Sequence, residues 1–76
     1  MSRLPRMSGR DTVKLLAKIG YLKDRQTGSH IVLRQQNYPH RRVVIPDHRE
    51  IAKGTLRAII HQVGLTVEEF VALYQG

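Results

Sequence analysis

The chain has 76 residues, and its 13 Lys and Arg against 6 Asp and Glu give a formal net charge of +7. A chain of this length forms one small domain that buries only about 60% of its unfolded surface, which excludes a large internal substrate cavity. With no cysteine, it has no disulfide, no thiolate zinc site and no thiol nucleophile. The surplus of positive charge favours a nucleic acid, an anionic membrane or an acidic protein as partner.

The first segment with helical periodicity follows a short basic stretch. Residues 1–7 are predicted to form a flexible basic arm, which leaves residues 8–76 as a single domain. Ser8 is a favourable N-cap, and the apolar stripe after it ends at Gly20, a typical C-terminal cap. We therefore predict a helix over residues 9–19.

Three segments rich in β-forming residues come next, separated by short turns. They cover residues 21–26, 30–34 and 41–45. Connections this short favour antiparallel pairing of consecutive strands, which predicts a three-stranded meander.

Alternation along the second of these strands separates its side chains into two faces. Ile31 and Leu33 share one face, which is purely apolar and is predicted to be buried against helices. His30, Val32 and Arg34 share the other face, which is predicted to meet water or a ligand.

The C-terminal third of the chain predicts two further helices. Apolar residues recur at helical spacing over residues 56–63 and again over residues 67–74. Thr66 and Glu69 have the spacing of a capping box at the start of the final, short helix. The predicted order is α-β-β-β-α plus this helix, an α+β fold with a three-stranded antiparallel sheet packed on helices.

Three short motifs lie at the boundaries of these elements: Gly28-Ser29-His30, Pro46-Asp47-His48 and Lys53-Gly54-Thr55-Leu56. In this order and spacing they resemble the HicA toxin family of bacterial and archaeal toxin–antitoxin modules, over about residues 8–70. The resemblance implies a fold similar to the double-stranded-RNA-binding domain, a ribosome-independent mRNA interferase activity and neutralisation by a HicB-like antitoxin. It also implies that residues 8–76 are one HicA-like domain and that His30 is its catalytic histidine. Many relatives have a second polar residue after this histidine, whereas this chain has Ile31 on the opposite face.

His30 also suits RNA cleavage on chemical grounds. Attack by the 2′-hydroxyl of the RNA requires removal of its proton, protonation of the leaving 5′-oxygen and compensation of the phosphate charge. An imidazole exchanges protons near neutral pH and can perform either transfer. Gly28 allows a sharp turn, and the Ser29 hydroxyl can hold the ring or a phosphate oxygen. The alternative is a solvated histidine at a strand end.

Four other residues are weaker candidates for the site. His48 is either a second proton carrier, a phosphate contact or an ordinary turn residue. Lys53 and Thr55 lie at a predicted helix start, where free N–H groups and the helix dipole favour phosphate but where an ordinary cap is equally expected. Arg34 is a candidate phosphate contact on the face of His30. The histidines lack metal-ligand spacing, so we expect no metal ion and no small-molecule cofactor.

The leading interpretation is therefore the toxin of a HicA/HicB-type module, a metal-independent endoribonuclease that cleaves mRNA. No apolar run reaches about 18 residues and no signal-peptide pattern is present, so we expect a cytoplasmic protein without membrane association. The alternatives are a non-catalytic double-stranded-RNA-binding module and a protein-interaction domain with an acidic partner. Only the enzyme would produce RNA fragments in the presence of a chelator.

Overall fold

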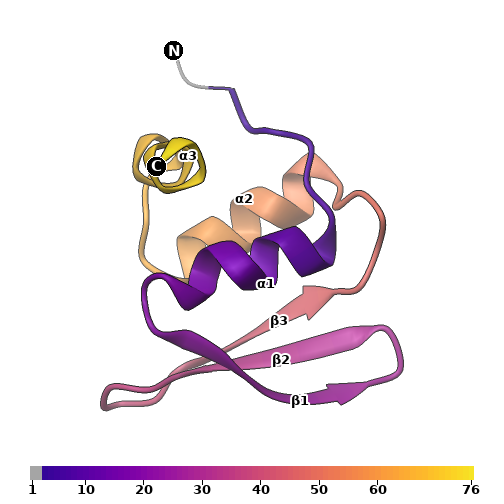
Figure 1. The fold of residues 1–76 in the computed structure, drawn as a ribbon, viewed down its shortest axis with the longest axis vertical. Coiled ribbons are helices and arrows are strands. Elements are labelled where there is room, and N and C mark those ends of the chain that lie inside the picture. The colour runs from indigo at the N-terminus through magenta and orange to yellow at the C-terminus, as the bar shows by residue number, and fades with distance from the viewer. Residues whose placement is uncertain (1–2) are drawn as a thin grey trace.

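The computed structural model describes residues 3–76, which fold in the order α1-β1-β2-β3-α2-α3 (Figure 1). The helices are α1 (Gly9–Ala17), α2 (Lys53–Gln62) and α3 (Val67–Gln75), and the strands are β1 (Tyr21–Thr27), β2 (His30–Gln35) and β3 (Arg42–Pro46). Both strand pairs are antiparallel, with β2 in the centre of the sheet. This confirms the predicted α+β meander and is compatible with a double-stranded-RNA-binding-domain-like arrangement. Within residues 3–76, no helix combines the length and the apolar content of a membrane span.

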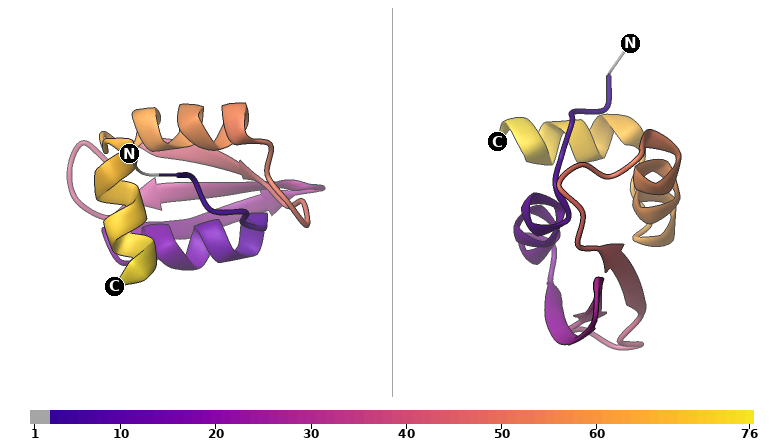
Figure 2. Two further views of the ribbon diagram at one scale, coloured as in Figure 1. Left: turned by 90° about the horizontal axis from the view of Figure 1, so that it is seen from above. Right: turned by 90° about the vertical axis from the view of Figure 1, so that its right-hand side faces the viewer.

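The helices all lie on one side of the sheet. Figure 2 shows α1 and α2 side by side over one face of the three strands, with α3 lying across them on the side away from the sheet. Contacts of α1 with β1 and β3, and of α2 with β3, hold this layer on the sheet. No helix formed by residues 3–76 covers the opposite face, which we call the outer face of the sheet.

Alternation along the strands supplies the core. Ile31 and Leu33 of β2 are buried in the core cluster, as predicted, and Val43 and Ile45 extend the same face onto β3. Apolar side chains of all three helices close this core, among them Leu16, Leu56, Ile60 and Phe70.

The outer face is less open than alternation alone predicts. Val32 is only 9% exposed and Arg34 is half-buried, so the expectation that both meet solvent is wrong for Val32 and only partly right for Arg34. Val32 lies in the central strand, between Arg25 of β1 and Val44 of β3, so side chains on both sides cover it. His30, at the end of the strand, is exposed as predicted.

The N-terminal segment is attached to the domain through its apolar residues. Leu4 and Met7 are buried in the core, and the N–H of Ile51 donates to the Met7 carbonyl at 2.8 Å. The alternation of basic and apolar residues in the predicted arm, residues 1–7, gave no sign of this attachment. Met1 and Ser2 of that arm lie outside the described residues.

The helix ends follow the predicted signals with small differences. The Ser8 hydroxyl accepts a hydrogen bond from the N–H of Asp11, and the capping box between Thr66 and Glu69 forms in both directions. The helix α1 ends at Ala17, before the predicted end at residue 19, because the chain there tightens into hydrogen bonds between residues three apart.

The start of α1 packs directly against the chain that leaves β3. A Cβ atom at Gly9 would overlap the carbonyl oxygen of Pro46 and would touch Asp47. The Gly9 N–H also donates to the carbonyl of His48 at 2.9 Å. Only glycine therefore fits this contact without a shift of backbone.

Replacing Gly9 with alanine is expected to lower the free energy of unfolding by about 1–3 kcal/mol, the usual cost of forcing a methyl group into a filled site. Gly54→Ala is the matched control in the first turn of α2, where an added Cβ meets no atom within 4 Å. That control is expected to be neutral or to stabilise by up to about 1 kcal/mol. Urea denaturation followed by circular dichroism measures both, and equal stabilities would show that α1 does not depend on the close contact.

Candidate active site

The turn between β1 and β2 presents His30 at the start of the central strand. Gly28 has φ +57°, in the left-handed region that favours glycine, which confirms its predicted role in the turn. His30 pairs with Thr27 on one side and with Pro46 on the other, while its side chain is exposed. The backbone of His30 is therefore fixed from both sides, and its ring remains accessible to a ligand.

A short hydrogen bond joins this turn to the chain that leaves β3. The N–H of Asp47 donates to the carbonyl of Ser29 at 2.6 Å. His30 and His48 each follow one of these two bonded residues in the chain, and both histidines are exposed. The structure thus brings the predicted motifs at residues 28–30 and 46–48 together.

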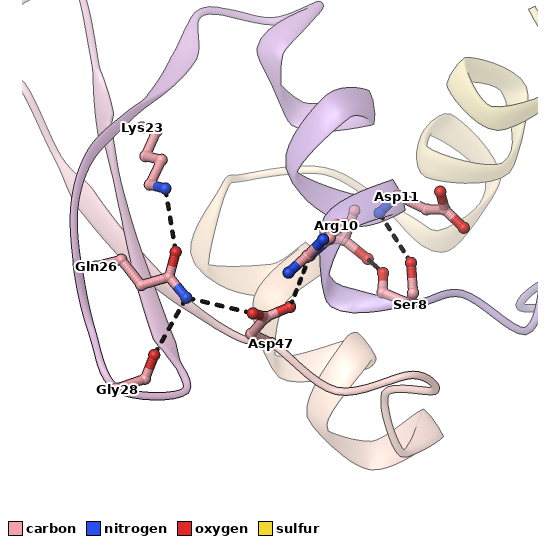
Figure 3. A network of polar contacts seen from close by, with 8 residues as sticks. Ser8, Arg10, Asp11, Lys23, Gln26, Gly28 and Asp47 are labelled. Carbon is pink, nitrogen blue, oxygen red and sulfur yellow. Dashed lines mark hydrogen bonds and ion pairs between the residues drawn. The ribbon is translucent and has the colours of Figure 1, made fainter.

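The carboxylate of Asp47 connects three elements (Figure 3). Its Oδ2 accepts a hydrogen bond from Gln26 Nε2 at 3.2 Å, and its Oδ1 lies 3.3 Å from Arg10 Nε. Gln26 Nε2 also donates to the Gly28 carbonyl at 3.1 Å, and Gln26 Oε1 accepts from Lys23 Nζ at 3.0 Å. Asp47 therefore joins the end of β1, the glycine turn and the first turn of α1.

Sequence reasoning missed this network. It gave no role to Arg10 or Gln26, and it treated Asp47 only as the middle residue of a motif. These three residues come from separate elements, and only the strand register and the packing of α1 bring them together. The one available signal was the position of Asp47 directly after a strand, between Pro46 and His48.

A shallow hollow opens beside this network. It is lined by Ser8, Arg10, Asp47, His48 and Arg49. Two arginines and a histidine surround a carboxylate that Arg10 and Gln26 already engage, and both arginines are exposed. The hollow therefore offers a predominantly cationic lining to an anion such as a phosphate group.

Lys53 and Thr55 lie in the first turn of α2, at the same end of the molecule as the β1–β2 turn (Figure 1). Both are exposed, and within residues 3–76 their side chains make no hydrogen bond to the 28–30 turn. Ala52 occupies the N-cap position and gives no side-chain cap, so the alternative of an ordinary cap from Gly54 or Thr55 does not occur.

Arg34 shares a strand face with His30 but lies further along β2. Four residues of extended strand separate the two by about 13 Å. The structure therefore places Arg34 on the same face of the sheet as His30 but not beside it. Within residues 3–76, no three His, Asp or Glu side chains gather as metal ligands. The roles assigned to these site residues remain predictions.

Asp47→Ala removes the acceptor that Gln26 and Arg10 share. Hydrogen bonds to a charged group are commonly worth about 1.5–3 kcal/mol, and partial exposure lowers the expected loss of unfolding free energy here to about 1 kcal/mol. The amides of residues 28–30 should also exchange faster with deuterium, because the turn loses its anchor. Urea denaturation and hydrogen exchange measure the two effects.

Asp24→Ala is the control, since it removes a second ion pair among residues 3–76, in which Arg42 Nε and Asp24 Oδ2 are 3.5 Å apart at the surface. It should change stability by no more than about 0.5 kcal/mol and leave exchange at the turn unaltered. If the amides of residues 28–30 exchange equally slowly in both variants, the Asp47 side chain does not anchor the turn.

Comparison with known protein families gives a match over most of the chain. The model of the family described as "HicA toxin of bacterial toxin-antitoxin" matches residues 9–65, which is more than half of the chain and includes all three motifs. Comparison with curated proteins and with solved structures gives no match. The family match assigns a toxin role within a toxin–antitoxin module, and with it an antitoxin partner. The chain belongs to the HicA toxin family.

Proposed function

We propose that this toxin is an endoribonuclease that cleaves mRNA by a metal-independent transesterification, with His30 as the catalytic residue. The observation that carries the proposal is the exposed His30 ring on a backbone position that Thr27 and Pro46 hold from either side. Rigid backbone with an accessible imidazole is the arrangement that proton transfer to or from a bound ribose requires.

The reaction needs two proton transfers. The 2′-hydroxyl loses its proton as the 2′-oxygen forms a bond to phosphorus, and the departing 5′-oxygen gains a proton as its bond to phosphorus breaks. His30 would perform one transfer, typically worth about 10²–10⁴ in rate. His48 is the proposed partner for the other, because the Ser29–Asp47 hydrogen bond brings its backbone beside the turn of His30. The products are a 2′,3′-cyclic phosphate and a 5′-hydroxyl.

The charge that develops on the phosphate needs donors and cations. The cationic hollow contains Arg10 and Arg49 together with His48 and offers such groups. Ser29 contributes an exposed hydroxyl beside His30. Lys53 and Thr55 would bind a further phosphate at the uncapped start of α2, where the helix dipole favours an anion.

The antitoxin partner is proposed to be HicB-like and to cover His30. A chain of net charge +7 favours rapid capture by an acidic surface, and an exposed ring is open to such a cover. Since mRNA is the proposed substrate, the cytoplasm is the proposed location.

His30→Ala is expected to reduce RNA cleavage at least about 100-fold, because it removes one proton transfer from the reaction. His61→Ala is the matched control, since His61 is an exposed histidine on α2, in the helical layer. It should cleave as the unsubstituted protein does. Gel analysis of labelled RNA incubated in chelator gives the rates, and circular dichroism verifies that both variants fold.

Three outcomes would count against the proposal. Full activity of His30→Ala would exclude His30 as the catalytic residue. Fragments that end in a 3′-hydroxyl would contradict transesterification. Binding of RNA without any scission by the unsubstituted protein would favour the non-catalytic double-stranded-RNA-binding module instead.

A further inference from the structure

We propose that the substrate is a single-stranded RNA that lies along the outer face of the sheet, from His30 to Tyr38. This inference rests on the proposed function and names its substrate class and binding surface. Between its two ends the surface consists of Leu22, Arg25, Val32, Arg34, Arg42 and Val44. The strand register places these residues on one face, because Leu22 and Arg42 flank Arg34 while Arg25 and Val44 flank Val32.

The charge of this face suits a polyanion. It carries three arginines, and the carboxylate of Asp24 lies 3.5 Å from Arg42 Nε. Within residues 3–76, Arg25 and Arg34 have no carboxylate partner. Two guanidinium groups therefore remain available for phosphate.

The Nε of Arg34 is the most direct indication that this face binds a ligand. This atom is covered by protein yet has no hydrogen-bond partner among residues 3–76. A covered N–H without an acceptor is unfavourable, so a ligand oxygen that draws the guanidinium toward it would supply what the protein does not. Arginine binds phosphate well in such a position because its donors form a rigid fork.

The apolar residues of the face favour a single strand over a duplex. Leu22 is 46% exposed and Val44 is 48% exposed, so the face offers apolar surface between its arginines. Tyr38, in the loop after β2, is 89% exposed. An unpaired base can stack on the Tyr38 ring and make apolar contacts with Leu22 and Val44, whereas a duplex hides the faces of its bases and presents mainly phosphates and sugars.

The order of these residues along the sheet fits one continuous strand of RNA. The β2 strand extends from His30 to Gln35 over about 17 Å. The loop with Tyr38 continues at that end, opposite the turn of His30 (Figure 1). The Tyr38 ring meets His40 edge-on at a centroid distance of 6.1 Å, and His40 Nδ1 lies 3.2 Å from the Gln35 carbonyl oxygen. RNA along β2 would thus meet the reactive histidine, then phosphate contacts, then a stacking ring.

An acidic protein segment could also satisfy the arginines. RNA is favoured because the same face carries the histidine that acts on a ribose phosphate in the proposed function. The exposed ring of Tyr38 is likewise better explained by a base than by a carboxylate.

Binding of 2′-O-methyl RNA tests the inference without cleavage, because the attacking hydroxyl is blocked. Fluorescence anisotropy would compare a single-stranded oligonucleotide with its duplex, and the single strand should bind more tightly. The double variant Arg25→Gln/Arg34→Gln should bind the single strand at least about tenfold more weakly and reduce the slope of log K against log salt by about 1.4 for two phosphate contacts. The matched control Lys14→Gln/Arg57→Gln removes two exposed charges from α1 and α2. It should weaken binding far less.

Tyr38 provides a second, independent measurement. Tyr38→Ala should weaken binding about tenfold, as expected for one lost base stack, while Tyr38→Phe should bind like the unsubstituted protein. If Arg34→Gln impairs folding, Arg25→Gln alone retains the test, because Arg25 is exposed.

Tighter binding of the duplex, or equal losses in the two double variants, would overturn the inference. The inference would also be overturned if the Arg25→Gln/Arg34→Gln variant retained RNA binding but no longer bound the purified antitoxin. The face would then be a protein docking surface. Failure of the proposed function gives a different result. In that case the blocked RNA binds as predicted, but unmodified RNA is not cut. If His30→Ala abolishes cleavage while the arginine variants cut and bind normally, only this inference fails.

Discussion

The close contact between the start of α1 and the chain leaving β3 determines the geometry of the candidate site. Residues between β3 and α2 form no regular structure, so other elements must fix them. Gly9 does this by lying against Pro46 and donating its N–H to the His48 carbonyl. This approach allows Arg10, the next residue of the helix, to reach the Asp47 carboxylate. The position of His48 thus depends on a glycine in a helix from the opposite half of the chain.

The parts of the fold that sequence predicted are those that depend on local periodicity. Alternation identified Ile31 and Leu33 as core residues, and glycine at position 28 identified the turn. Each of these signals lies within a few residues of the structure that it predicts. The burial of Val32 was not predictable in this way, since it depends on which residues of β1 and β3 lie beside it. The attachment of the N-terminal segment through Met7 likewise depends on a hydrogen bond to Ile51, which is distant in sequence.

The same distinction explains the candidate site. The Gly28-Ser29-His30 motif was visible because its three residues act through one turn, and the structure shows that turn with His30 exposed. The hydrogen-bond network of Asp47 could not be predicted from the sequence, because its partners Gln26 and Arg10 are 21 and 37 residues away along the chain. Positive charge was predictable in amount but not in position. Arg34 lies further along β2 on the face of His30, whereas Lys53 lies in the first turn of α2, and only the three-dimensional structure separates the two positions.

The two faces of β2 couple the stability of this small domain to the exposure of His30. Ile31 and Leu33 need the helical side of the sheet, which forces His30 and Arg34 onto the outer face. A slip of one residue in the register would place the histidine in the core and the isoleucine in solvent, so the apolar pattern itself holds the imidazole outside. The core of a domain this small is too limited to enclose a substrate cavity. An accessible imidazole must therefore stand on a surface whose reverse side is the core, and the alternation of one central strand meets both requirements.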